Sequence, residues 1–269
     1  MKTFITIVLV LIKVNTFAQQ KDNVVGKVFY TFKHMSDTTQ QNSYREENMK
    51  LYVGKSLNEY FSADQEKKDS LRLKQIESGG GFVINTGGKK TTATQILTDK
   101  VTKKIIIKES LIKKYYYEDA YPNIIWKITS EVKEIGDIKC TKAEGNYKGR
   151  VYYAWFTTEL PLTGAPWKLL GLPGLVLEAY DTKKQVMFLF AGIEKNHGKI
   201  SEINLEPPGA IKTTKKDYLQ METVAKSDPM GFINSTAADA GSGLQLSTSG
   251  ANGNFKPKKP SNPVELKDN

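Results

Sequence analysis

The stretch Lys27-Val28-Phe29-Tyr30-Thr31-Phe32-Lys33 sets the pattern for most of this chain. Successive side chains of a β-strand point to opposite faces of the sheet, so every second residue lies on the same face. Val28, Tyr30 and Phe32 therefore share one face, while the other face carries mainly lysine and threonine and is interrupted only by Phe29. This alternation predicts a strand that buries one face in a core and exposes the other to water.

The same two-residue rhythm recurs in segments rich in valine, isoleucine, threonine and aromatic residues. The strands that it predicts are 25–34, 49–53, 101–109, 111–118, 124–130, 138–147, 150–158, 175–181, 185–194 and 200–206. Turn residues at 148–149, 182–184 and 196–198 leave gaps that are too short for parallel crossovers, which need about a dozen residues or more. We therefore expect a mainly β fold, with a strongly curved antiparallel sheet in the form of a half-barrel or partly open barrel.

One or two short helices should accompany this sheet. Residues 63–78 are charged and predict either a short helix or a loop. A better candidate begins at Thr213, with Thr214 as the N-cap, Asp217 three residues further on, and Pro229 as the residue that ends it. The apolar residues of this second helix should dock on the sheet.

The first eighteen residues have the order of a secretory signal peptide. A charged start at Lys2 is followed by an apolar run over 4–12 and by the small-residue site Thr16-Phe17-Ala18. The run is broken at Lys13, and a membrane-spanning helix needs about 20 apolar residues. We expect cleavage after Ala18 and an exported chain, periplasmic or extracellular, that does not span a membrane once the signal is removed.

The composition changes again near the C-terminus. After residue 236 glycine, serine, asparagine, lysine and proline dominate, and such a segment buries too little apolar surface to offset the entropy of ordering. The predicted organisation is a signal peptide over 1–18, one β-rich domain over 19–236 and a low-complexity tail over 237–269. Within that tail, Asn262-Pro263-Val264-Glu265-Leu266 regains apolar character and is expected to fold back as an edge strand.

The chain is basic, with a formal net charge of +10, which removal of the two lysines in residues 1–18 lowers to +8. Lysine supplies nearly all of this charge, and Arg45, Arg72 and Arg150 are the only arginines. Phosphate and base recognition favour arginine, so we expect no nucleic-acid partner. The lysines are interpreted as solvated faces, with attraction to anionic lipid or glycan as the alternative.

Familiar catalytic signatures are missing from the sequence. Gly87-Gly88-Lys89 is followed by Lys90 where a phosphate-binding loop needs serine or threonine, and no Gly-x-Ser-x-Gly elbow follows a predicted strand. The only histidines, His34 and His197, are far apart and lack local metal-ligand spacing. We expect no catalytic residue, metal or cofactor. A hydrolase with a scattered active site that uses one of the histidines is the alternative.

Cys140 is the only cysteine, so the chain forms no internal disulfide. It lies in a predicted strand and should behave as a small buried hydrophobe. A reactive or metal-binding thiol is the alternative interpretation.

One segment is unusually apolar for a connection between strands. Residues 157–181 read TTELPLTGAPWKLLGLPGLVLEAYD, in which prolines and glycines alternate with leucines and a tryptophan. The segment is interpreted either as a buried crossover that caps the sheet or as a loop that gates an apolar ligand or docks a partner. The residues predicted to contact a ligand or partner are Trp155, Trp167, Leu170, Leu172 and Pro173.

Gly171-Leu172-Pro173-Gly174-Leu175-Val176 resembles the hexapeptide of the GLPGLI family, also called Porph_ging, of exported Bacteroidota-type proteins. Four further stretches resemble family positions in the same order: 125–128 (IWKI), 140–143 (CTKA), 153–156 (YAWF) and 262–266 (NPVEL). Val176 replaces the final isoleucine, and Ala165-Pro166 stands where the family commonly has Gly-Pro.

The resemblance covers most of the chain after the signal peptide. It implies an exported envelope protein and supports the expected fold, but the family carries no established activity, so it transfers no catalytic residue. We therefore expect a non-catalytic module that binds an apolar ligand, such as a lipid or acyl chain, or an envelope protein partner.

Overall fold

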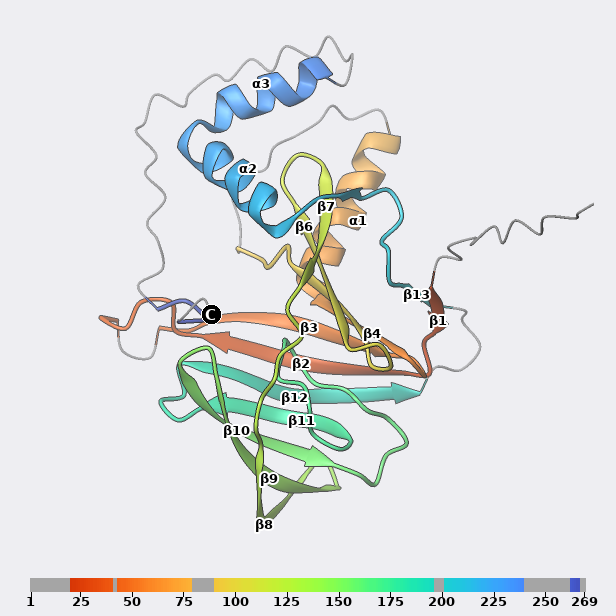
Figure 1. Ribbon diagram of the computed structural model, residues 1–269, viewed down its shortest axis with the longest axis vertical. Coiled ribbons are helices and arrows are strands. Elements are labelled where there is room, and N and C mark those ends of the chain that lie inside the picture. The colour runs from red at the N-terminus through yellow and green to blue at the C-terminus, as the bar shows by residue number, and fades with distance from the viewer. Residues whose placement is uncertain (1–19, 41–42, 79–89, 196–200, 240–261, 267–269) are drawn as a thin grey trace, which may run out of the picture.

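The computed structural model describes residues 20–40, 43–78, 90–195, 201–239 and 262–266. The predicted signal peptide, the turn at 196–198 with His197, and most of the predicted low-complexity tail lie outside these ranges. The fold is mainly β, with a large curved sheet that does not close into a barrel, as the sequence predicts. Figure 1 shows the helices towards one end of the molecule and strand β8 at the other.

The strands are β1 (Lys21–Asn23), β2 (Gly26–His34), β3 (Arg45–Val53), β4 (Leu57–Ser62), β5 (Gln95–Asp99), β6 (Lys104–Ser110), β7 (Lys114–Asp119), β8 (Lys127–Ile135), β9 (Ile138–Tyr147), β10 (Arg150–Thr157), β11 (Leu175–Asp181), β12 (Val186–Lys195), β13 (Glu202–Asn204) and β14 (Ile211–Lys212). Within the described residues, twelve of them form one sheet in the order β14-β7-β6-β5-β4-β3-β2-β12-β11-β10-β9-β8, and β1 pairs with β13. Every pairing is antiparallel except that of the short β14 with β7.

The alternation in β2 places its aromatic side chains in the main core. Val28, Tyr30 and Phe32 are each at most 5% exposed, as the alternation predicts. Phe32 lies opposite Phe188 of β12 on one side and opposite Glu47 of β3 on the other. Residues that share this face through the sheet register define what we call the inner face.

The part of the sheet formed by β4 to β7 is covered on both faces. A second, smaller core cluster lies opposite the inner face and consists of Val24, Leu57, Leu97, Ile106, Tyr116, Ile203 and Leu205. Burial on both faces explains the uninterrupted Ile105-Ile106-Ile107 in β6. It also explains why β4 and β5 were not predicted, because a strand buried on both faces shows no apolar alternation.

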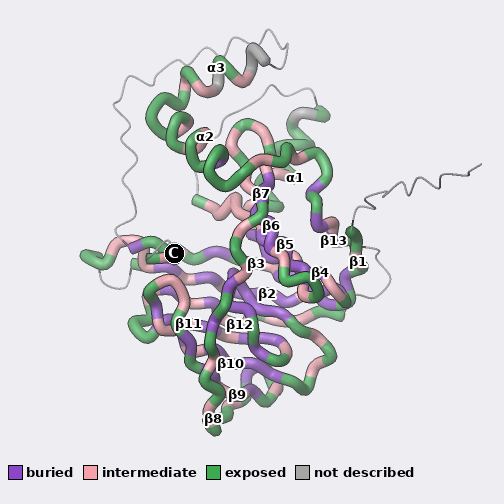
Figure 2. The backbone as a smooth tube through the Cα atoms, viewed as in Figure 1, coloured by how far each residue is buried: buried purple, intermediate pink, exposed green. Residues whose placement is uncertain are grey.

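The described residues form three helices, one more than predicted: α1 (Ala63–Glu77), α2 (Lys215–Ser227) and α3 (Pro229–Asp239). Thr214 caps α2 and accepts a hydrogen bond from the backbone N–H of Asp217, as predicted. Pro229 follows the end of α2 and occupies the first position of α3, where a proline is well tolerated. Helix α3 extends to Asp239, past the predicted domain boundary at residue 236. Figure 2 shows that α2 and α3 are mainly exposed, whereas buried residues concentrate in the strands.

Helix α2 docks on the inner face through Tyr218, which is 4% exposed. The ring centroid of Tyr218 lies 5.5 Å from that of Tyr117 on β7. Helix α1 packs instead against the opposite face of β3, where Lys50 forms an ion pair with Glu66. None of the helices in the described ranges is long and apolar enough to cross a membrane.

The connection between β10 and β11, residues 158–174, crosses the inner face as a cover. Leu169 is fully buried and Leu170 and Leu172 are each 7% exposed, so the leucines of this loop belong to the main core. Gly174 closes the loop with a φ of +124°, and a Cβ atom there would lie 2.1 Å from the carbonyl oxygen of Thr157. Glycine is therefore required at this position.

Candidate ligand-binding cavity

The last described residues, 262–266, fold back onto the domain, and we call them the C-terminal segment. The backbone N–H of Asn262 donates to Ser36 O at 3.2 Å, and that of Leu266 donates to Lys148 O at 3.0 Å. The expected return of this segment to the domain is therefore confirmed. The expected edge strand is wrong, because the segment follows an irregular path with side-chain contacts in place of a ladder.

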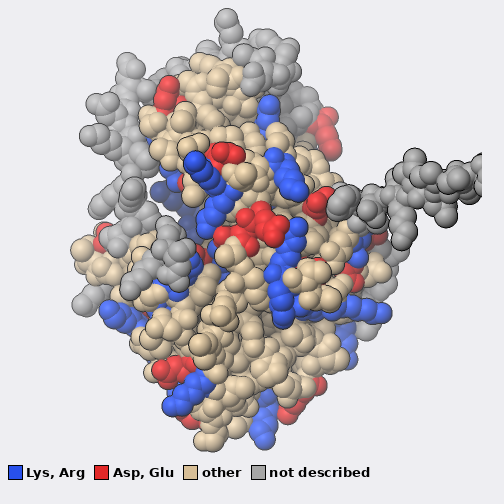
Figure 3. Space-filling view, viewed as in Figure 1, with Lys and Arg blue, Asp and Glu red and all other residues tan. Residues whose placement is uncertain are grey.

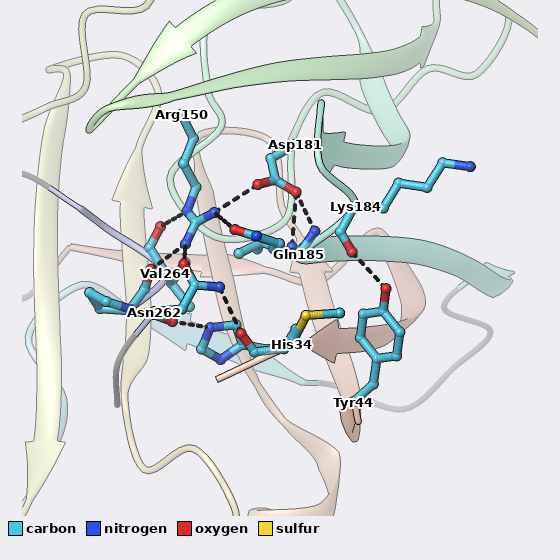
Figure 4. Close-up of polar contacts among 11 residues, drawn as sticks. His34, Tyr44, Arg150, Asp181, Lys184, Gln185, Asn262 and Val264 are labelled. Atoms are coloured by element: carbon cyan, nitrogen blue, oxygen red, sulfur yellow. Dashed lines mark hydrogen bonds and ion pairs between the residues drawn. The ribbon is translucent and has the colours of Figure 1, made fainter. Parts of the chain in front are cut away.

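Arg150, at the start of β10, holds the C-terminal segment. Its side chain is buried and donates through Nε to Val264 O at 3.0 Å and through Nη2 to Pro263 O at 2.6 Å (Figure 4). Nη2 also donates to Oδ1 of Asn262. One guanidinium thus replaces water for three acceptors of the segment.

The remaining face of Arg150 forms a buried ion pair with Asp181 at the end of β11. Nη1 lies 2.7 Å from Asp181 Oδ2, and both side chains are at most 3% exposed. The other carboxylate oxygen accepts from the backbone N–H groups of Gln185 and Val186. Because each charge is hydrogen-bonded as well as paired, the cluster avoids the large penalty of an uncompensated buried ion.

His34, at the end of β2, completes this cluster. Its Nε2 lies 2.7 Å from the carbonyl oxygen of Asn262, so Nε2 carries the hydrogen and donates it. Burial lowers the pKa of His34, and the nearby charges of Arg45 and Arg150 act in the same direction. The ring is therefore neutral at pH 7 and holds the C-terminal segment in place.

A cavity of about 220 Å³ lies between the inner face and its two covers. Strands β2, β3, β4 and β12 form one side, and Trp167 and the C-terminal segment form the other. The lining residues are Phe32, His34, Arg45, Met49, Tyr60, Thr92, Trp167, Phe188, Pro263 and Val264. A mainly apolar lining with a few fixed polar groups is typical of small-molecule sites.

Aromatic rings give the cavity a fixed wall. The rings of Phe32 and Phe188 stack with centroids 5.1 Å apart, and Tyr60 meets Phe188 edge to face at 6.4 Å. The guanidinium of Arg45 lies over Phe32, with Cζ 5.9 Å from the ring centroid. Such pairs hold each other in position, because each ring fills the space that would let its neighbour rotate.

A buried carboxylate supports the polar end of the cavity. Glu47 is 1% exposed and accepts hydrogen bonds from Ser62 Oγ, from the backbone N–H and hydroxyl of Thr92, and from Arg45 Nη2. Arg45 Nη2 also donates to Thr92 Oγ1 at 2.9 Å. Glu47 thus fixes the guanidinium of Arg45 at the cavity.

Trp167 connects the loop cover to the C-terminal segment. It has a φ of +54°, and its Nε1 donates to Glu265 Oε1 at 3.1 Å. The neighbouring Lys168 is 8% exposed. Its Nζ lies 3.0 Å from Asp119 Oδ2 and 3.1 Å from Glu265 Oε1. Burial disfavours the charged form of Lys168, but the negative charges of Glu265 and Asp119 have the larger combined effect and raise the pKa of Lys168.

A smaller cavity of about 120 Å³ lies under the GLPGLV stretch. Leu170 and Leu172 line it together with Asn58 and Lys100. The ammonium of Lys100 donates to Gly54 O at 2.8 Å. A polar cavity of this size is large enough for ordered water, so it does not by itself indicate a ligand.

The structure separates the five residues predicted to form a site. Trp167 lines the larger cavity, Leu170 and Leu172 line the smaller one, and Pro173 is exposed to solvent. Trp155 lies on the face opposite to the inner face, since the residues opposite it in the ladders are Lys142 and Glu178.

The side chain of Trp155 has two polar neighbours on this outer face. Its Nε1 donates to Tyr180 Oη at 3.2 Å, and the ammonium of Lys133 lies 4.5 Å from the ring centroid. Of the two tryptophans singled out by the sequence, only Trp167 contacts the cavity.

The polar residues of the site were missed by the sequence reasoning. Arg45 and Glu47 share a face of β3 with Met49, Leu51 and Val53, so the alternation already places two charges at core positions. Charges on the buried face of an amphipathic strand need partners or a function. That signal could have pointed to this end of the sheet.

Two other kinds of site considered from the sequence are a reactive thiol and a metal site. Cys140 is fully buried on β9, which confirms its expected burial, and burial raises the pKa of its thiol to about 11. Among the described residues no group of three histidine, cysteine, aspartate or glutamate side chains could hold a metal ion.

Surface lysines are interleaved with acidic side chains over the face drawn in Figure 3. Lys33 pairs with Glu46, and Lys104 pairs with Glu118 at 3.0 Å. Exposed pairs of this kind contribute little to stability. The view favours the interpretation of the lysines as solvated faces on that side of the molecule.

No protein-family model and no curated protein matches this sequence. Among solved structures, the fold is similar to that of PNGF-II in the P21 space group, with a TM-score of 0.53 and 12% identity over 78% of this chain and 34% of that one. The same protein in the C2 space group gives a TM-score of 0.54 and 12% identity over 75% and 33% of the two chains. This chain thus spans about a third of the length of the PNGF-II chains, and at this identity the likeness shows the fold alone.

Proposed function

We propose that this chain is an exported, non-catalytic binding module that holds a small apolar ligand in the cavity beside Trp167. The observation that carries the proposal is the cavity of about 220 Å³, which has aromatic walls and a few fixed polar groups. A cavity of about 150 Å³ is large enough for benzene, so this one would take a ligand of roughly ten non-hydrogen atoms. A single acyl tail or a substituted aromatic ring fits that size.

Export is part of this proposal and is supported by the sequence. The order of a charged start, an apolar run and a small-residue site over 1–18 is typical of a signal peptide. The resemblance of residues 171–176 to the GLPGLI hexapeptide points in the same direction.

The C-terminal segment is the proposed entrance. Pro263 and Val264 form part of the cavity wall, and the segment is held mainly through Arg150 and His34. Release of these contacts would open the cavity without rearranging the sheet. Movement of the loop over 158–174 would instead expose leucines of the main core.

A fragment screen tests the proposal directly. Saturation-transfer NMR on the full chain should detect apolar fragments of about ten non-hydrogen atoms, whereas Val264→Phe should weaken their binding by about tenfold or more because the larger side chain fills the cavity. Val101→Phe is the matched control, since Val101 is 72% exposed and is not among the residues that line the cavity. Circular dichroism would verify that both variants fold.

Two results would overturn the proposal. One is fragment binding that is equal in Val264→Phe and in the unmodified chain. The other is no fragment binding at all, together with a defined protein partner that co-purifies in a fixed ratio, which would favour the docking interpretation.

A further inference from the structure

We infer that the ligand carries an acceptor oxygen of carbonyl or carboxylate type at one end of its apolar body, and that this oxygen accepts hydrogen bonds from the Tyr60 hydroxyl and Arg45 Nε. This inference rests on the proposed function and specifies the chemistry of the same cavity. It concerns two residues that the sequence did not single out.

The Tyr60 hydroxyl is the first observation. Tyr60 is 2% exposed and lines the cavity, yet its hydroxyl has no hydrogen-bond partner among the described residues. Buried hydroxyl groups nearly always have a partner. Tyr30 lies on the same inner face, opposite Met49 in the ladder between β2 and β3. Its hydroxyl is paired in the usual way, since it donates to Val176 O at 2.7 Å.

Arg45 is the second, independent observation. Its Nε is buried and lacks a partner within the described chain, although its Nη2 is held by Glu47 and Thr92. The guanidinium is therefore fixed in position with one donor unused. Tyr60 and Arg45 both line the cavity, so a ligand there lies against two side chains that each carry an unused donor.

The unused groups select the polarity of the ligand. A phenolic O–H and a guanidinium N–H both donate, so they need an acceptor. The one carboxylate beside them, Glu47, already accepts four hydrogen bonds from Ser62, Thr92 and Arg45. A protonated ligand amine can donate to the Tyr60 oxygen or to Nδ1 of neutral His34, but it cannot accept from Arg45 Nε and would lie beside a like charge. A carbonyl or carboxylate oxygen can accept from both unused donors.

A matched ligand series tests this inference. Isothermal calorimetry on the full chain would compare phenylpropanoate, phenylpropanamide, phenylpropylamine and propylbenzene, which share one apolar body. We expect the acid and the amide to bind about tenfold tighter than the amine, which corresponds to one or two net hydrogen bonds. The comparison of acid with amide reports whether the site prefers a charged or a neutral acceptor, and either preference supports the inference.

Tyr60→Phe and Tyr30→Phe separate the site from the rest of the core. Tyr60→Phe should weaken the acid and the amide by about fivefold or more and leave propylbenzene unchanged, because only the hydroxyl is removed. Tyr30→Phe removes a hydroxyl that is bonded within the protein, so it should leave the affinity for all four ligands unchanged. Thermal melts of both variants would verify that they fold.

The outcomes distinguish this inference from the proposed function. Binding of propylbenzene with equal or tighter binding of the amine overturns the inference and leaves the apolar cavity standing. Unchanged acid and amide affinity in Tyr60→Phe also overturns it. If none of the four ligands binds, the proposed function fails together with the inference.

Discussion

The loop over residues 158–174 and the C-terminal segment both cover the inner face of the sheet, but they use different chemistry. The loop inserts Leu169, Leu170 and Leu172 into the main core, and each buried leucine contributes about 1.5–3 kcal/mol. The C-terminal segment contributes mainly hydrogen bonds, which are worth about 1 kcal/mol net for the one from neutral His34 and about 1.5–3 kcal/mol each for those from the charged Arg150.

The loop is anchored at both ends to the core strands β10 and β11, and lifting it would expose Leu169, Leu170 and Leu172 to water. The C-terminal segment is attached mainly through hydrogen bonds, and water can replace these when the segment detaches. We therefore expect the segment to detach far more readily than the loop, and the cavity lies where the two covers meet at Trp167 and Val264.

Replacement of Arg150 should have the largest effect. Arg150→Met leaves the buried charge of Asp181 without a partner and removes the donors to the C-terminal segment, so the free energy of unfolding should fall by about 3–5 kcal/mol. Urea denaturation would measure this change. Lys67→Met, at an exposed position of α1, is the control and should shift stability by no more than about 0.5 kcal/mol. An equal effect of both variants would contradict the assignment of Arg150 to a buried cluster.

A leucine from each cover gives the next comparison. Leu169→Ala should cost about 2–5 kcal/mol because Leu169 is fully buried, whereas Leu266→Ala should cost about 0.5 kcal/mol or less because Leu266 is 46% exposed. Denaturation of both variants under the same conditions measures the difference. A similar loss of unfolding free energy in the two variants would contradict the view that the loop, but not the C-terminal segment, is part of the core.

Asn262 tests the attachment of the C-terminal segment alone. Its side chain accepts from Arg150 and donates to Met35 O at 2.7 Å, so Asn262→Ala should cost about 1–2 kcal/mol. Hydrogen exchange should become faster at the amide of Leu266 while the amides of β2 stay protected. Faster exchange throughout β2 would show that the segment is as much a part of the core as the loop.

The pH dependence of the same segment gives the smallest expected effect. Burial lowers the pKa of His34 in the folded chain, so the unfolded chain takes up the proton first as the pH falls. The stability contributed by neutral His34 is therefore present above its unfolded pKa, near 6.5, and is lost as the pH falls through the folded pKa. Stability curves at several pH values should be flatter between pH 7 and 5 for His34→Gln. The same slope in both proteins would exclude His34 as the titrating group.

Much of the fold could be predicted because one rule, the alternation of side chains, controls most strands. The predicted bounds of β9 and β11 are those observed, and β2 differs by one residue. The rule fails for β4 and β5, where burial on both faces removes the alternation. It also fails for the C-terminal segment, which is held by side chains and has no repeating pattern.

The candidate site could be predicted only in part. The apolar character of residues 157–181 located the loop cover, but sequence spacing does not tell which tryptophan faces the cavity. The ladder position of Trp155, opposite Lys142 and Glu178, and the left-handed backbone at Trp167 decide that question. The contact between Arg150 and Asn262 joins residues 112 positions apart, and no local pattern indicates such a pair.

Fluorine NMR of the chain labelled with fluorotryptophan tests the cavity most directly. The three tryptophans give three signals, which the variants Trp126→Phe, Trp155→Phe and Trp167→Phe would assign. Titration with phenylpropanoate should shift the Trp167 signal in a saturable way and leave the Trp155 signal unchanged, because Trp155 lies on the opposite face of the sheet. A Trp167 signal that stays unchanged at saturating ligand, or a response at Trp155 in its place, would contradict a binding site between the two covers.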